Sequence, residues 1–105
     1  MVDLSYAGRL HPGHSSLSAV NAARVGDAVL LVKDGDRWLL HNEKGQVLSR
    51  MSKSFAPPPN TRFERGEIAT IFKWRKEDSG EAFHHTLRRD AWEVVLPELV
   101  FVPVN

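Results

Sequence analysis

Turn-forming residues interrupt this chain at intervals of about eight to twelve residues, and this spacing constrains its fold more than any other feature. Asp34-Gly35-Asp36 and Asn42-Glu43-Lys44-Gly45 separate three apolar runs. An Asp-Gly pair between alternating apolar residues is the strongest short-range signal for a β-hairpin. We therefore predict a meander of three strands, at Ala28–Lys33, Arg37–Asn42 and Gln46–Arg50.

Three successive prolines divide the chain into two halves. The segment Ala56–Asn60 cannot be a central strand or a helix interior, because proline lacks a backbone N–H and fixes φ. We expect this segment to be a stiff, extended crossing over one end of the sheet. In the second half, strands are predicted at Glu67–Lys76, Ala82–Arg88, Trp92–Leu96 and Leu99–Val102, with a break at Pro97.

One short helix is predicted near the N-terminus. His11-Pro12-Gly13-His14 is a turn signal, because proline fixes φ and glycine permits positive φ. Ser15 or Ser16 is predicted to cap the helix that follows. Apolar residues then recur at helical spacing, so the helix is expected to end at Asn21 or Ala23.

The length of 105 residues fits one domain. We expect residues 1–15 to form an N-terminal tail or approach segment and residues 16–105 to form a single domain. Short strands, frequent turns and one small helix predict an all-β fold, a small, partly open β-barrel of about six to seven strands. No apolar run approaches the roughly 18 residues of a membrane span, so we expect a soluble, cytoplasmic protein.

The sequence contains no recognisable catalytic or metal-binding pattern. His11 and His14 have a ligand-like spacing but lack a third ligand. His84 and His85 are neighbours in a predicted strand, so their side chains point to opposite faces. The chain has no cysteine, which excludes disulfides and zinc–thiolate sites. We therefore expect no enzyme activity, metal or cofactor in this domain, and a function based on binding.

Positive charge is concentrated in the middle of the chain, although the net charge is only +1. Between Arg50 and Lys76 there are seven basic and two acidic residues. Such segregation gives a neutral protein a basic face if the residues converge. The alternative is that the same residues lie scattered along solvated strand edges.

Aromatic side chains are interleaved with these cations. Phe63 and Trp74 lie among them, and an exposed ring beside cations is typical of proteins that bind single-stranded nucleic acid. The alternative is that both rings pack into the protein interior. The candidate nucleic-acid-binding residues are Lys53, Arg62, Phe63, Arg65, Lys73, Trp74, Arg75 and Lys76.

Short motifs run through most of the chain. They are Leu10–His14, Val25–Asp27, Trp38–Leu40, Gly45–Arg50, Phe55–Pro58 and Trp92–Phe101. Together they resemble the extreme C-terminal region of a set of large bacterial RecQ-like DNA helicases. The Gly-Asp turn before a strand and the later apolar-Ser-Arg step also loosely resemble the HIRAN domain, a small β-barrel that grips DNA ends. This sequence departs from the HIRAN pattern because it lacks the Asn-x-x-Asp segment between strands.

The resemblance implies a non-catalytic accessory domain of a nucleoid-associated DNA helicase. Such a domain would hold single-stranded or fork DNA through a basic groove, and the helicase motor domains of the same parent chain would be its other partner. No membrane or metal partner is implied. An alternative function is docking on another protein or domain through the apolar C-terminal strand Val94–Val102, which can exceed what a small core buries.

Overall fold

One curled antiparallel sheet forms the framework of the protein. The computed structural model describes residues 2–78 and 86–104. Its strands are β1 (Ala28–Asp34), β2 (Arg37–His41), β3 (Val47–Arg50), β4 (Thr61–Arg75) and β5 (Ala91–Pro103), in the order β3-β2-β1-β4-β5. The described helices are η1 (Ala7–Arg9), α1 (Ser15–Ala22) and η2 (Lys76–Asp78). The protein is thus mostly β with one short α-helix, which confirms the predicted all-β class.

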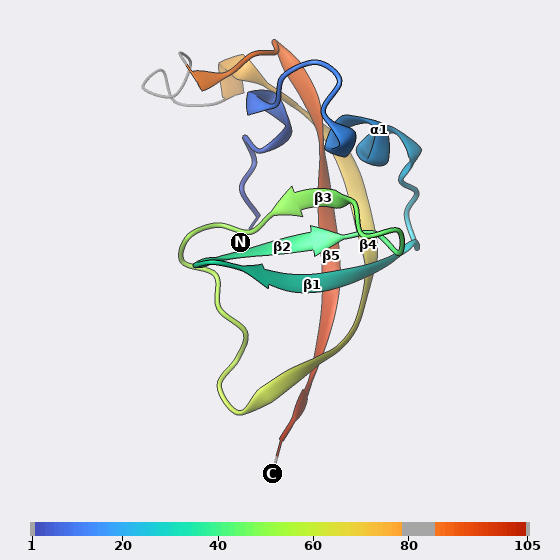
Figure 1. Ribbon diagram of the computed structural model, residues 1–105, viewed down its shortest axis with the longest axis vertical. Helices are drawn as coiled ribbons and strands as arrows, with labels where there is room; N and C mark the ends of the chain where they lie inside the picture. Colours follow the sequence, from blue (N-terminus) through green and yellow to red (C-terminus); the bar gives the residue numbers. More distant parts are fainter. Residues whose placement is uncertain (1, 79–85, 105) are drawn as a thin grey trace.

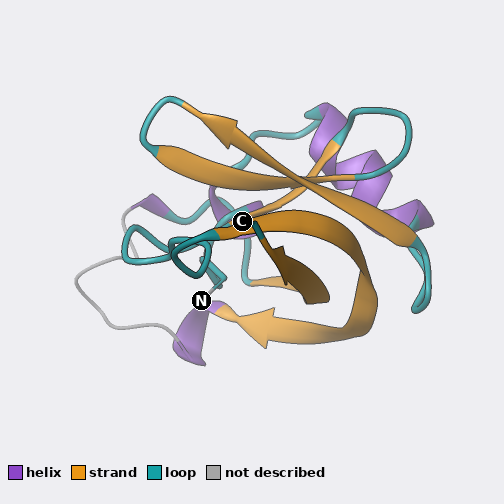
Figure 2. Ribbon diagram, turned by 90° about the horizontal axis from the view of Figure 1, so that it is seen from below, coloured by secondary structure: helices purple, strands orange, loops and turns teal. Residues whose placement is uncertain are grey.

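The sheet bends sharply where the three shorter strands meet the long β4–β5 ribbon. Only two residue pairs join β1 to β4, and the shorter strands cross the long pair at a steep angle (Figure 1). β4 has register shifts between Phe63 and Arg65 and between Ile68 and Thr70. Such bulges bend a strand and increase its twist. The long strands therefore curl, and the sheet forms a half-barrel (Figure 2).

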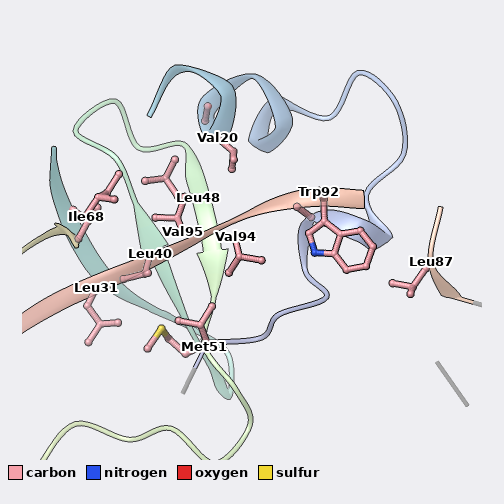
Figure 3. Close-up of a cluster of buried hydrophobic side chains, with 14 residues drawn as sticks. Val20, Leu31, Leu40, Leu48, Met51, Ile68, Leu87, Trp92, Val94 and Val95 are labelled. Carbon is pink, nitrogen blue, oxygen red and sulfur yellow. The ribbon is translucent and has the colours of Figure 1, made fainter. Parts of the chain in front are cut away.

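The core lies between the shorter strands and the long ribbon. Leu40, Met51 and Val95 are fully buried there, in a cluster of side chains from several strands (Figure 3). Ser49 Oγ donates a hydrogen bond to the Val95 carbonyl at 3.1 Å. Because β3 and β5 are the two edges of the sheet, this bond holds the edges of the half-barrel together.

The segment that was expected to approach the domain as a tail is packed against the sheet. Val2 forms an antiparallel bridge with Met51, and Trp92 Nε1 donates to the Leu4 carbonyl at 2.7 Å. Gly8 lies against the Trp92 ring, where a Cβ would come within 2.7 Å of a ring carbon. The segment belongs to the domain because it covers this large indole, which is 5% exposed.

The helix α1 forms where the sequence predicts it, but with a different cap. His14 Nδ1 accepts a hydrogen bond from the Ser16 backbone N–H at 3.1 Å, so the predicted serine cap is wrong. The Ser16 hydroxyl is instead buried in the first turn, 3.1 Å from the Tyr6 hydroxyl. This side chain joins the helix to the N-terminal segment and is not available for capping.

The predicted count of six to seven strands is not confirmed. Trp92–Leu96 and Leu99–Val102 are parts of one strand, β5, which continues through Pro97. An edge strand tolerates proline because one side of its backbone has no strand to bond. The first four residues of the predicted strand Ala82–Arg88 lie outside the described residues, and its last three belong to no strand.

Candidate nucleic-acid interface

The basic residues that were predicted to form one groove are spread along β4. At about 3.3 Å per residue, Arg62 and Arg75 are roughly 40 Å apart along the strand. Arg75 forms ion pairs with Glu77 at 2.9 Å and with Asp78 at 3.3 Å. The two ends of β4 therefore cannot line a single short groove, and one of them is largely neutralised.

Other predicted cations on β4 also have acidic neighbours. Lys73 is paired in register with Glu93 on β5, and Arg65 lies 3.3 Å from Glu64. Lys76 is half-buried in η2. These side chains match the alternative in which the charges are scattered along strand edges.

The two predicted stacking residues are packed against other rings. Phe63 contacts Phe101 edge-to-face, with centroids 6.0 Å apart. Trp74 is paired in register with Trp92 and lies edge-to-face with Phe72 at 6.2 Å. Both side chains are half-buried, which agrees with a packing role.

Lys53 belongs to a second group of cations, which do converge. An open hollow of about 530 Å³ lies where the N-terminal segment meets the start of β2 and the end of β3. This hollow, here named the basic hollow, is lined by Asp3, Arg9, Arg37, Arg50, Ser52 and Lys53. The structure therefore brings one predicted site residue together with three arginines that were not in the predicted set.

Asp3 lies among the three arginines. Its carboxylate accepts hydrogen bonds from Arg9 and from Nε and Nη2 of Arg50, the latter two at 3.2 and 2.7 Å. Arg37 Nη2 is 3.8 Å away. Burial raises the pKa of this carboxyl, but hydrogen bonds from Arg50 and the Ser5 amide and the charges of Arg9 and Arg50 outweigh burial. The pKa of Asp3 is therefore lowered, and its side chain is ionised at neutral pH.

Two of the arginines have further contacts that hold them in place, one beside β3 and one in the N-terminal segment. Arg37 Nη2 donates to the Met51 carbonyl at 3.0 Å, and the Arg50 guanidinium lies 5.9 Å from the centroid of the Tyr6 ring. Arg37 Nε is buried and has no hydrogen-bond partner among the described residues. A buried donor without an acceptor costs about 1–3 kcal/mol, so an acceptor beside this Nε–H would stabilise the side chain.

The basic hollow has a clear excess of positive charge. Three arginines and one lysine surround one carboxylate, which leaves three positive charges without a negative partner in the hollow. The arginine side chains are 18–30% exposed, so their field is less weakened by water than that of fully exposed charges. Guanidinium groups bind phosphate oxygens in a bidentate manner, and a lysine adds a point charge. The arrangement is suited to binding phosphate.

Sequence patterns gave only part of the information needed to find the basic hollow. The hairpin signal at Asp34-Gly35 fixes the register of β1 and β2, and with the next turn it brings Arg50 beside β2. Asp3 and Arg9 reach the same place only through packing of the N-terminal segment. Neither residue belongs to a motif that indicates this contact.

Most large side chains of the apolar C-terminal segment are buried or half-buried. Val95 is fully buried, and Leu99 and Phe101 are partly buried against the core. Val104, at 47% exposure, is the large apolar residue of this segment that remains open to solvent. The segment therefore offers less free apolar surface than its composition suggests.

No family model, curated protein or solved structure matches this chain. In the described ranges, 2–78 and 86–104, no helix is long and apolar enough to cross a membrane. Across the same residues, no group of three histidine, cysteine, aspartate or glutamate side chains could hold a metal ion. The basic hollow is therefore the feature of the described residues that indicates a function.

Proposed function

We propose that this chain is a non-catalytic accessory domain that binds the DNA phosphate backbone, chiefly at the basic hollow. The observation that carries the proposal is the convergence of Arg9, Arg37, Arg50 and Lys53 around a single carboxylate. The resemblance to the C-terminal region of RecQ-like helicases suggests the setting, a domain that holds single-stranded or fork DNA beside the helicase motor. The curled half-barrel is compatible with the small, partly open barrel expected for such a domain.

The openness of the basic hollow favours a polymer over a small ligand. Pockets for small molecules usually bury about 70–90% of the ligand surface, whereas this hollow is a shallow surface feature lined mainly by long cationic side chains. A nucleic-acid backbone presents successive phosphates and needs only local contact at each one. The Ser52 hydroxyl, which lines the hollow, adds a neutral hydrogen-bond donor.

A second cationic contact lies beyond the proline-rich crossing. Lys53 precedes the crossing, and Arg62 and Arg65 follow it on β4, where both are exposed. Cations at both ends of the crossing can contact separate phosphates of one DNA molecule. This proposal keeps Lys53, Arg62 and Arg65 of the predicted groove, although Glu64 lies 3.3 Å from Arg65. It leaves out Lys73 and Arg75, which also have acidic neighbours and lie at the far end of β4.

Fluorescence anisotropy with a labelled single strand and a labelled fork tests the proposed function. We expect binding at about 50 mM salt that weakens as salt rises, with a log–log slope near −0.7 for each phosphate contacted on a single strand. Arg37→Ala and Arg50→Ala are each expected to weaken binding about tenfold, because a charged hydrogen bond contributes roughly 1.5–3 kcal/mol. Arg24→Ala is the matched control, because Arg24 is exposed and lies outside the basic hollow.

Two results would overturn the proposal. Absence of binding at low salt, or binding that does not weaken with salt, rules out backbone recognition. A loss in Arg75→Ala as large as that in Arg50→Ala moves the contact to the far end of β4, as the sequence-based groove has it.

A further inference from the structure

An apolar surface adjoins the basic hollow on the outer face of the shorter strands. Side chains alternate along a strand, so Leu30 and Val32 face away from the core residue Leu31. Val32 is paired in register with Leu39, and Leu39 with Arg50. Cross-strand neighbours on one face have Cβ atoms about 4.5–5.5 Å apart. A continuous row therefore runs from Val32 through Leu39 to Arg50 of the basic hollow. Leu30 lies next to Val32 on the same face of β1.

One residue of this row is unusually exposed, and the other two, Val32 and Leu39, are half-buried. Leu30 is 50% exposed, although it lies in the middle of β1. The other large apolar residues that are as exposed among the described residues are Val25 and Val104, and both lie outside regular strands. Leu30, Val32 and Leu39 together form the outer row.

We propose that the outer row is a base-contacting surface, so that one nucleic-acid strand lies with its phosphates at the basic hollow and its bases on these three side chains. The inference rests on the proposed function. The cation Arg50 and the apolar residue Leu39 are direct neighbours, so a ligand must present negative charge and apolar surface close together. An unpaired strand carries phosphates and open base faces within one nucleotide, and such bases pack on flat apolar or aromatic surfaces.

A duplex does not fit this surface equally well. Its bases are stacked inside, so a duplex would place phosphates or sugars against the outer row. Charged phosphates lose hydration beside Leu30 and Val32 without gaining a partner. The geometry therefore favours an unpaired strand over a duplex.

The decisive experiment compares strands that differ only in their bases. Oligothymidine of about 15 nucleotides, an abasic strand of the same length and the corresponding duplex are titrated at one salt concentration. We expect wild-type protein to bind oligothymidine about fivefold or more tightly than the abasic strand, with the duplex no tighter than the abasic strand. Leu30→Ser and Leu39→Ser are expected to bring the thymidine preference below about twofold while the abasic affinity stays unchanged.

Val104→Ser is the matched control, because Val104 is equally exposed and lies outside the outer row. Thermal unfolding checks that each variant is folded, and Leu30→Ser carries the test alone if Leu39→Ser does not fold. Equal affinity of the wild-type protein for the thymidine and abasic strands would refute the base-contacting surface, but would not contradict the proposed function. This result is expected if the outer row binds another protein. Variants that weaken both strands equally also refute it. If neither strand binds in a salt-dependent manner, the proposed function itself fails.

Discussion

Replacement of Asp3 by asparagine measures how much the arginine cluster stabilises the fold. The carboxylate is 14% exposed and accepts hydrogen bonds from Arg9 and Arg50. Hydrogen bonds to charged groups contribute roughly 1.5–3 kcal/mol each, but the amide oxygen of asparagine keeps part of this, and the arginines are partly solvated. We therefore expect Asp3→Asn to lower the free energy of unfolding by about 2 kcal/mol at pH 7. For a domain of this size, the melting temperature should fall by about 8–16 °C.

The pH dependence provides an independent check on the same interaction. The pKa of Asp3 is lower in the folded protein than in the unfolded chain, so its contribution is complete above the unfolded value of about 3.9. The contribution is lost as the pH falls through the folded pKa, because the protonated carboxyl no longer attracts the arginines. Wild type and Asp3→Asn should thus differ in melting temperature at pH 7, and the difference should shrink as the pH falls below about 4.

Circular dichroism melts across this pH range are the assay. Asp36→Asn is the control, because Asp36 is an exposed acid in the β1–β2 turn. Equal melting temperatures of wild type and Asp3→Asn at pH 7 would refute the reasoning. So would a difference that persists unchanged at pH 2, because it could not then come from the ionised carboxylate.

Two further predictions concern packing. Leu40→Ala should lower the free energy of unfolding by about 2–5 kcal/mol, because Leu40 has no exposed surface and its truncation leaves a cavity. Urea titration measures this loss. Leu30→Ala, at a half-exposed position, is the control and should change the free energy of unfolding by under about 1 kcal/mol. Gly8→Ala should cost about 1–3 kcal/mol through overpacking, because its Cβ would meet the Trp92 ring, which cannot turn away without losing its bond to Leu4. A Gly8→Ala variant with an unchanged melt and unchanged tryptophan fluorescence would contradict the close contact.

The parts of the fold that could be predicted from sequence are those fixed by local signals. The turn at Asp34-Gly35 sets the pairing of β1 and β2, and the helical spacing of apolar residues locates α1. The long strand β4 was expected from Glu67, but it begins at Thr61. Its first residues pair with the end of β5, which is a long-range interaction that strand patterns along the chain do not show.

The convergence of charges was harder to predict than the strands. A local count of basic residues includes Lys73 and Arg75. In the structure, Lys73 is paired in register with an acidic residue of β5, and Arg75 forms ion pairs with two acidic residues of η2. The count gave no weight to Arg9 and Arg37, which stand alone in the sequence. Charges act through space, so only the tertiary fold could identify the basic hollow.

The hydrogen bond between Trp92 and Leu4 has a consequence for the synthesis of the chain. It joins residues 88 positions apart, and such non-local contacts form late and slow folding. The N-terminal segment, which carries Asp3 and Arg9, lacks this anchor until β5 has been translated. A nascent chain that has made Arg37 and Arg50 would therefore still have an incomplete basic hollow, and the hollow would be completed only after β5 has been translated.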